Sequence, residues 1–379
     1  MNWQLIESDA ALEDLIGAHE ACEAVIVDTE FMRRNTFFPQ VALLQMSFAM
    51  PGQRHPPGSD KAWLVDPVRI QDTSSLKALW SDASKVKVLH SASEDLEVFQ
   101  HWLGVLPRPL FDTQRAAALV GHGFGLGYRA LVQTICEVDL DKGETCSDWL
   151  QRPLTTSQCD YAAQDVTWLL PVWRALDEAC REQGRLDWVL SDGRDALESL
   201  GSATVDYHRR IKLAWKLDRQ QLGVLAALCQ WREETARERD KPRSWIIDDK
   251  ACLQLAQSAP RDWPALKSLS GLPAPAVRRY GDALLELIER QSDAPSDSLP
   301  EALPKPLDSR QREVLKKMKA QVRDIAAELQ CAPEVLLQSK DYELLLRDTE
   351  GADVEVPPAW LGWRSDLVLA PLRKSLGAL

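Results

Sequence analysis

Short apolar runs, separated by polar turn-forming stretches, fill the first half of the chain. Four of these runs are rich in Val, Leu and Ile and predict β-strands over residues 24–31, 41–49, 62–67 and 86–91. About ten residues join the first two runs, and a connection of that length favours an antiparallel hairpin over a crossover. Apolar residues recur at helical spacing between the strands. The pattern predicts a three-layer α/β domain over residues 1–200.

The second half of the chain loses the strand pattern and becomes helical. Residues 217–240 place their leucines on one stripe of a long amphipathic helix. Residues 291–308 contain four prolines and few large apolar side chains, which predicts an extended linker. The α/β domain is therefore expected to precede a helical domain over 207–292, a proline-rich linker over 293–308 and a second helical domain over 309–379.

The composition is 45% apolar and 27% charged, which is typical of globular proteins and excludes a disordered or fibrous one. No apolar run approaches the roughly 20 residues of a membrane helix, and the acidic N-terminal stretch lacks a signal-peptide pattern. We therefore expect a cytoplasmic protein with no membrane partner. The eight cysteines are irregularly spaced without a C-x-x-C pair, so neither a disulfide framework nor a zinc site is expected.

The formal net charge of −12 is unevenly distributed. Residues 1–200 carry 17 basic and 30 acidic side chains, whereas residues 207–250 carry 11 basic and 7 acidic ones. An acidic first half argues against a protein that simply coats nucleic acid, because such proteins are normally basic. It fits a domain that gathers carboxylates around cations, and the basic island is then the candidate for phosphate contact.

Two carboxylates stand at the end of the first predicted strand. Asp28 and Glu30 are two residues apart, and the period of a strand is two, so both side chains point to the same face. Like charges placed together repel unless a cation neutralises them, and Mg²⁺ and Mn²⁺ prefer such oxygen ligands. A solvent-facing pair at a strand end is the structural alternative.

Two further carboxylates add to this pair. Thr155 begins a helix with a capping-box signature, and the helix is expected to run to about Gly184. On that helix Tyr161 and Asp165 are four residues apart and share one face. Asp95 follows the fourth predicted strand, where α/β domains place functional groups. The alternatives are a structural helix-face pair and an acidic residue that stabilises a helix dipole.

Four converging carboxylates could hold two divalent ions about 4 Å apart, which is the geometry of in-line phosphoryl displacement. One ion would turn a bound water into the nucleophile, and the other would stabilise the leaving 3′ oxygen. The Tyr161 hydroxyl would orient that water or help to remove its proton.

Three segments carry a resemblance to a known family. VDTEF (27–31), HSASEDLEVF (90–99) and YAAQDV (161–166) resemble the three motifs of DEDD 3′–5′ exonucleases in the tyrosine-containing branch. Residues 141–166 resemble ribonuclease D in particular, although Gly143 stands where a polar residue is expected.

A later segment, residues 228–250, resembles the helical HRDC module. The resemblance thus covers nearly the whole chain. It implies an RNase H-like three-layer α/β exonuclease domain followed by all-α HRDC-type domains, of which the last is a degenerate second copy.

The resemblance also implies the chemistry. Asp28, Glu30, Asp95 and Asp165 become the ligands of two Mg²⁺ or Mn²⁺ ions, and Tyr161 becomes the residue that orients water. The expected enzyme is a 3′–5′ exoribonuclease that trims tRNA precursors and other small structured RNAs and releases 5′-mononucleotides. RNA 3′ ends are the expected partner, and no obligate protein partner is evident.

Other residues are weaker candidates for RNA contact. Gln45 lies inside a predicted strand and His90 at a strand end, where each is as well explained by internal hydrogen bonding. A dense basic cluster beside Trp245 combines cations with an aromatic ring, as nucleic-acid sites do, or else forms a solvated helix end. The cluster consists of Arg237, Arg239, Lys241 and Arg243.

Two other functions remain compatible with the motifs. The first is a 3′–5′ exonuclease that prefers DNA, because contacts to the 2′-hydroxyl are not encoded in the motifs. The second is a non-catalytic scaffold that binds nucleic acid, against which the intact set of carboxylates and Tyr161 argues.

Overall fold

The computed structural model describes residues 2–140, 143–144, 147–201, 206–352 and 354–376. Its contacts divide the chain into two compact units. The first contains Met1–Met32, Gln40–Gly201 and Asp308–Leu379, and the second contains Arg33–Pro39 and Ser202–Leu307. No helix in the described ranges is both long enough and apolar enough to cross a membrane.

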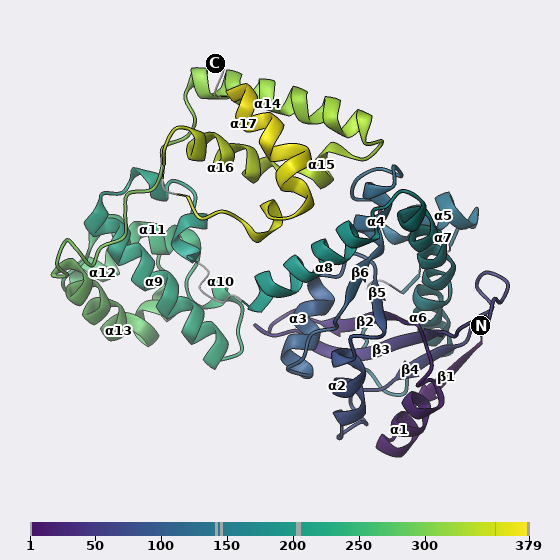
Figure 1. Cartoon of the computed structure of the whole chain (residues 1–379). Helices are drawn as coiled ribbons and strands as arrows, with labels where there is room; N and C mark the ends of the chain where they lie inside the picture. The colour runs from purple at the N-terminus through teal and green to yellow at the C-terminus, as the bar shows by residue number, and fades with distance from the viewer. Residues whose placement is uncertain (1, 141–142, 145–146, 202–205, 353, 377–379) are drawn as a thin grey trace. The chain divides into compact units, whose positions relative to one another are not determined.

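A mixed β-sheet lies at the centre of the first unit (Figure 1). Its described strands, in spatial order, are β1 (Trp3–Ile6), β4 (Ala62–Val65), β3 (Gln40–Ala49), β2 (Ala24–Met32), β5 (Val86–Leu89) and β6 (Leu110–Asp112). β2 and β3 pair antiparallel, which confirms the predicted hairpin, whereas β2 pairs parallel with β5. The register of the hairpin shifts between Glu30 and Phe31, where Ala42 of β3 is the extra residue, so a bulge in β3 lies beside the carboxylates.

Different helices cover the two faces of this sheet. On one face, Val25 and Val27 of β2 join a large apolar core. The helices that pack there are α1 (Asp9–Ala18), α2 (Ser74–Ser81), α3 (Ser93–Trp102) and α8 (Leu186–Gly201). Because strand side chains alternate in direction, Asp28 and Glu30 point to the other face. On that face α6 (Thr156–Thr167) contacts β2, β3 and β4, so the carboxylate pair lies against α6.

The helix predicted from Thr155 to about Gly184 is two helices. The capping box at Thr155 is present, as predicted. The prediction of one continuous helix is wrong, because α6 ends at Thr167 and α7 (Leu169–Glu182) follows it. Pro171 explains the break, since it has no N–H to donate to the carbonyl of Thr167. Two shorter helices pack against α7, namely α4 (Thr113–Leu119) and α5 (Tyr128–Cys136).

The C-terminal helices belong to the first unit. They are α14 (Ser309–Glu328), α15 (Pro333–Leu336), α16 (Ser339–Thr349) and α17 (Ala370–Leu376). The guanidinium of Arg364 donates two hydrogen bonds to the Asp192 carboxylate of α8, at 2.6 and 2.8 Å. The rings of Trp188 and Trp363 stack with their centroids 4.3 Å apart. These contacts, of which the Arg364–Asp192 pair is buried, join residues 308–379 to the sheet domain, and a relation to the HRDC module stays a prediction.

The second unit is helical. Its longer helices are α9 (Arg219–Glu238), α11 (Asp249–Ser258) and α13 (Ala274–Ser292), with α10 (Arg243–Ile246) and α12 (Trp263–Lys267) between them. Leu225, Leu228 and Leu255 are completely buried in a core of their own. Residues 293–308 form no helix or strand, as expected for the proline-rich linker. The unit therefore has its own apolar centre.

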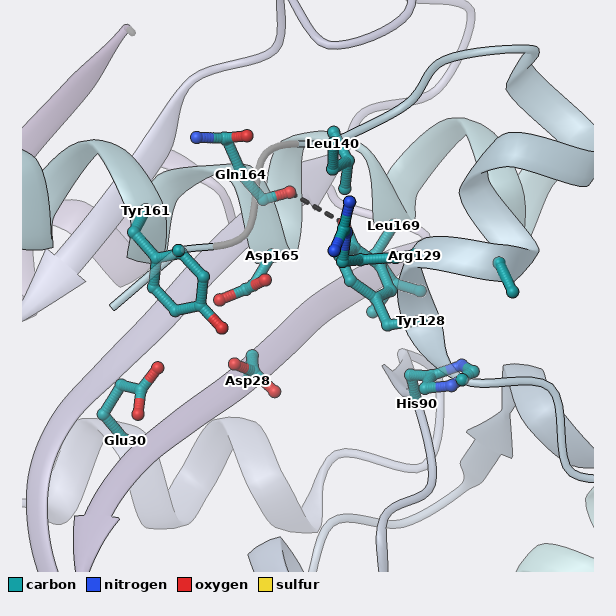
Figure 2. A pocket seen from close by; sticks show the side chains of 13 residues that line it. Asp28, Glu30, His90, Tyr128, Arg129, Leu140, Tyr161, Gln164, Asp165 and Leu169 are labelled. Carbon is teal, nitrogen blue, oxygen red and sulfur yellow. Dashed lines mark hydrogen bonds between the residues drawn. The ribbon is translucent and has the colours of Figure 1, made fainter. Parts of the chain in front are cut away.

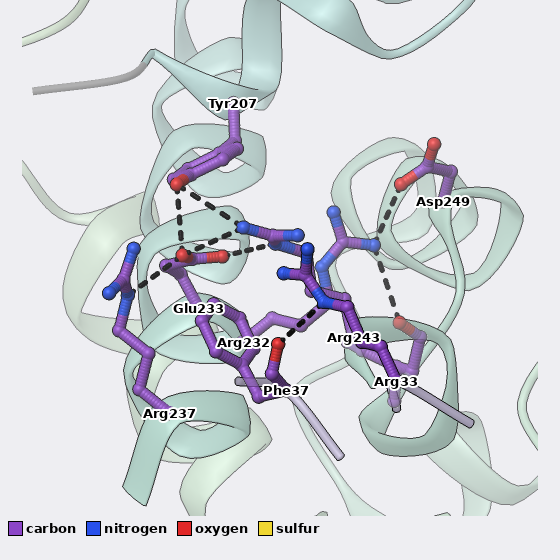
Figure 3. Close-up of polar contacts among 9 residues, drawn as sticks. Arg33, Phe37, Tyr207, Arg232, Glu233, Arg237, Arg243 and Asp249 are labelled. Carbon is purple, nitrogen blue, oxygen red and sulfur yellow. Dashed lines mark hydrogen bonds and ion pairs between the residues drawn. The ribbon is translucent and has the colours of Figure 1, made fainter. Parts of the chain in front are cut away.

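Residues 33–39 connect β2 to β3 but pack within the helical unit. Asp240 Oδ1 accepts hydrogen bonds from the backbone N–H groups of Phe37 and Phe38, at 2.9 and 3.0 Å. The Phe37 ring is 5% exposed and lies 4.8 Å from the Arg237 guanidinium and 4.7 Å from that of Arg243 (Figure 3). The loop of the hairpin that carries Asp28 and Glu30 is thus held by helical-unit side chains.

Candidate active site

Two elements of the first unit bring the predicted catalytic residues together. β2 contributes Asp28 and Glu30, and α6 contributes Tyr161 and Asp165 one helical turn apart. All four line a cavity of about 700 Å³. Figure 2 shows the carboxylates and the Tyr161 hydroxyl directed toward one another. The predicted sharing of one helix face by Tyr161 and Asp165 is therefore confirmed.

Three of the carboxylates have the spacing of a metal site. Asp28, Glu30 and Asp165 each offer one oxygen atom, and these atoms lie within 4.8 Å of one another. Each side chain is half-buried, enclosed by protein on most sides and open to the cavity. Carboxylate oxygens in this arrangement suit a hard divalent cation.

Asp95 approaches the same region from the start of α3. It is not one of the three closely spaced ligands, and its Oδ1 accepts a hydrogen bond of 2.5 Å from the Thr29 hydroxyl. Burial raises the pKa of Asp95 to about 7, against the lowering effect of the Thr29 hydrogen bond. The charge of Asp95 nevertheless acts on the cluster, since it helps to raise the pKa values of Asp28 and Glu30.

Burial and mutual repulsion make the cluster costly to ionise without a counterion. Burial, followed by the charge of Asp165 and then Asp95, raises the pKa of Asp28 well above its usual value. Burial and the charge of Asp28 raise the pKa of Glu30 to about 9. The pKa of Asp165 is also well above its ordinary value, through burial and then the charge of Glu30. A bound divalent cation would relieve both effects, so the donor set fits such an ion.

The Tyr161 ring lies close against Gly143, the position at which the sequence departs from the ribonuclease D pattern. A Cβ atom at Gly143 would lie only 1.7 Å from Cδ2 of the Tyr161 ring, so no larger residue fits without displacing the ring. Burial and the charges of Asp165 and Glu30 raise the pKa of Tyr161. The phenol is therefore protonated at neutral pH and can serve as a hydrogen-bond donor beside the carboxylates.

Two cavity residues on α5 were not predicted. Tyr128 donates a hydrogen bond from its hydroxyl to the Gln164 carbonyl, at 2.7 Å, which ties α5 to α6 (Figure 2). Arg129 brings a cation to an otherwise acidic cavity, and its Nη2 lies 3.2 Å from Asp139 Oδ1. Its buried Nε has no hydrogen-bond partner among the described residues. The sequence motifs that mark the carboxylates include neither Tyr128 nor Arg129.

The weaker candidates have different surroundings. His90 lines the cavity, its Nδ1 lies 3.0 Å from the Thr113 hydroxyl, and burial lowers its pKa. Gln45 pairs with Asp28 across the β2–β3 hairpin. It is fully buried and is not among the residues that line the cavity. Contact of either residue with RNA stays a prediction.

The basic cluster of the helical unit is engaged in internal contacts. Arg237 and Arg243 both pair with Glu233, which also accepts a hydrogen bond of 2.9 Å from the Tyr207 hydroxyl (Figure 3). Arg239 donates to the Tyr280 hydroxyl at 2.6 Å, and Lys241 Nζ lies 3.3 Å from the Asn35 carbonyl oxygen. These contacts give the four residues structural roles, and their contact with RNA stays a prediction.

Comparison with known proteins agrees with this geometry. Residues 3–180 match the 3′–5′ exonuclease family, and residues 221–288 match the HRDC domain family. Ribonuclease D of Pseudomonas paraeruginosa is 40% identical over 366 residues, which cover 96% of this chain and 94% of that protein. The chain belongs to the ribonuclease D family. Ribonuclease D of Escherichia coli K12 is 35% identical, with 99% of each chain covered.

A solved structure extends the similarity to the whole fold. The crystal structure described as Escherichia coli RNase D, an exoribonuclease involved in structured RNA processing, superposes with a TM-score of 0.90 at 34% identity. The match covers 100% of this chain and 99% of the other. As a ribonuclease D family member, the protein is a 3′–5′ exoribonuclease with an α/β exonuclease domain followed by a helical HRDC domain, and its acidic cluster indicates use of divalent metal.

Proposed function

We propose that this chain trims the 3′ ends of tRNA precursors and other small structured RNAs, and releases 5′-mononucleotides with the help of two Mg²⁺ or Mn²⁺ ions per site. The observation that carries the proposal is the set of three carboxylate oxygens within 4.8 Å of one another, beside the Tyr161 hydroxyl in a cavity. The similarity to an exoribonuclease involved in structured RNA processing supports the substrate class. A cytoplasmic location fits this substrate.

The carboxylates and Tyr161 would have different roles in the reaction. Asp28, Glu30 and Asp165 would hold the metal ions, with Asp95 completing the set. Bound divalent cations supply a water of lowered pKa and neutralise charge on the scissile phosphate. Tyr161 keeps its proton and would orient the attacking water by hydrogen bonding.

Arg129 would contact the RNA backbone in the same cavity. Among the described residues that line the cavity it is the one Lys or Arg side chain, and its buried Nε has no hydrogen-bond partner among the described residues. A phosphate oxygen of the RNA would satisfy that donor through a charge-assisted hydrogen bond. The side chain would thus help to seat the 3′-terminal nucleotide.

A gel time course tests the proposal. A 5′-labelled tRNA precursor with a 3′ extension is incubated with the full chain in Mg²⁺, in Mn²⁺ and in chelator, next to a DNA strand of the same extension sequence. We expect a ladder that shortens from the 3′ end only with metal, and faster digestion of RNA than of DNA. Equal or faster digestion of DNA would favour a DNA-preferring exonuclease.

A variant separates catalysis from binding in that experiment. Asp28→Asn removes one metal-ligand charge at almost constant volume. We expect it to abolish the ladder while RNA still binds. If trimming persists in this variant, the assigned ligands are wrong; if the unmodified chain binds RNA but never trims it, the scaffold alternative is favoured.

A further inference from the structure

Gln45 is a buried polar side chain that lies outside the three exonuclease motifs. It stands in the middle of β3 and is 0% exposed. Both polar atoms of its side chain, Oε1 and Nε2, are buried and have no hydrogen-bond partner among the described residues. Burying an amide without partners costs free energy, so Gln45 weakens the fold unless a neighbour uses its polar atoms.

The register of the sheet places one candidate partner directly beside Gln45. Asp28 of β2 is opposite Gln45 on one side, and Leu64 of β4 is opposite it on the other. Directly opposed residues of antiparallel strands project from the same face, with their Cβ atoms about 4.5–5.5 Å apart. Leu64 has no polar side-chain atom, which leaves Asp28. Its carboxylate accepts no hydrogen bond from another side chain in the described ranges.

A glutamine amide is well suited to orient a carboxylate that must also bind a cation. It donates an N–H group without carrying a positive charge, whereas a lysine or arginine in its place would neutralise Asp28 and compete with the cation. The nitrogen must face the carboxylate, because the amide oxygen carries only lone pairs and would be repelled. Donation to one carboxylate oxygen leaves the other oxygen of Asp28 for the metal ion.

The burial of Gln45 indicates that it acts through Asp28 and not by touching the substrate. It is not among the residues that line the catalytic cavity, and α6 contacts this face of β3. We propose that Gln45 is a positioning residue, which donates a hydrogen bond from Nε2 to the Asp28 carboxylate and holds it in the orientation that binds the divalent cation. The inference rests on the proposed function, in which Asp28 is a metal ligand. Residues that orient metal ligands typically contribute about 10–100-fold to metal affinity.

The test measures Mn²⁺ binding by the full chain without RNA, from the electron paramagnetic resonance signal of the free ion. Gln45→Met removes both polar atoms and keeps an unbranched side chain of similar length. We expect this variant to bind Mn²⁺ about tenfold more weakly or worse. In trimming assays it should lose activity at low Mn²⁺ and regain it when the Mn²⁺ concentration is raised in proportion, with the KM for RNA unchanged.

Leu43→Met is the matched control. Leu43 lies two residues away on the same face of β3, is also fully buried and is opposite Glu30. Its replacement alters the packing beside the other carboxylate of β2 but removes no polar group, so Mn²⁺ affinity should equal that of the unmodified chain. Thermal unfolding in chelator gives a second readout. Gln45→Met should have a Tm no lower than that of Leu43→Met, because it removes an amide that is buried without a partner.

The outcomes separate this inference from the proposed function. If Gln45→Met binds Mn²⁺ as tightly as Leu43→Met does, the positioning role is overturned even where the unmodified chain trims the tRNA precursor. A Tm of Gln45→Met in chelator clearly below that of Leu43→Met would also overturn it, since the amide would then support the fold itself. If only Gln45→Met loses Mn²⁺ affinity but the unmodified chain never trims RNA, the positioning role holds and the proposed function fails. An unmodified chain that binds no Mn²⁺ would overturn both.

Discussion

The carboxylate cluster should make Asp28→Asn inactive and, without metal, more stable than the unmodified chain. Burial and the charges of Asp165 and Asp95 raise the pKa of Asp28, so the folded state must either keep a proton or hold an uncompensated charge. An asparagine side chain has nearly the same shape, but it carries no charge and needs no bound proton to be neutral. A residue needed for catalysis would therefore destabilise the metal-free fold.

The magnitude follows from the spacing of the oxygens. Two unit charges 4.8 Å apart repel by about 3 kcal/mol at an effective dielectric constant of about 20. The pH dependence has the sign expected for acids whose pKa is raised by folding. Stability is highest below the unfolded pKa and falls as the pH rises toward the folded pKa, which for Glu30 spans 4.5 to about 9. At about 1.4 kcal/mol per pH unit, Glu30 alone lowers stability by about 3 kcal/mol between pH 4.5 and 7.

Differential scanning calorimetry in chelator at pH 5 and pH 8 measures this effect. We expect Asp28→Asn to raise Tm by about 6 °C at pH 8, and by much less at pH 5, where the unfolded carboxylates are themselves partly protonated. Addition of Mn²⁺ should stabilise the unmodified chain more than the variant, because bound metal favours the folded state.

The control is Asp14→Asn, which removes an exposed carboxylate from α1. It should leave Tm unchanged at both pH values. The reasoning would be refuted if Asp28→Asn lowered Tm in chelator at pH 8, or if Mn²⁺ stabilised both proteins equally.

Two further predictions concern side chains that position others. Gly143→Ala should lower kcat in single-turnover trimming about 100-fold, similar to Tyr161→Phe, because its Cβ displaces the Tyr161 ring; a near-normal rate would show that the ring position is unimportant. Phe37→Ala should lower the stability of the helical unit to urea by about 3 kcal/mol or more, since it empties a buried site between two guanidinium groups; an unchanged midpoint would contradict that packing.

Local patterns predicted the elements of the catalytic domain that depend on nearby residues. The hairpin of β2 and β3, the capping box at Thr155 and the shared face of Tyr161 and Asp165 are all confirmed. Each follows from the period of a strand or helix, or from a hydrogen bond that spans three residues. The prediction of one continuous helix to about Gly184 was wrong, because it followed the helical spacing of apolar residues across Pro171. The proline, which interrupts a helix, is visible in the sequence.

Such local patterns did not predict the contacts between segments that are far apart in the sequence. The basic cluster near residue 240 suggested solvent or RNA as its partner, yet Arg237 and Arg243 enclose Phe37, about 200 positions earlier in the chain. Nothing near Phe37 marks it as a partner, because an aromatic residue in a hairpin loop is equally compatible with exposure. The same holds for Arg364 and Asp192, whose buried pairing joins the C-terminal helices to the first unit.

The loop at residues 33–39 continues the catalytic hairpin but packs within the helical unit. The strand that presents Asp28 and Glu30 continues directly into the segment that Asp240 and its arginine neighbours hold. The hairpin ladder keeps one register from Ala24 to Glu30, and the register shifts after Glu30, where Ala42 of β3 is the extra residue. Ala42 is fully buried, and its carbonyl accepts a hydrogen bond of 2.6 Å from Arg152 Nη2, so the bulge itself is fixed and the ladder that carries Asp28 and Glu30 ends at an anchored residue.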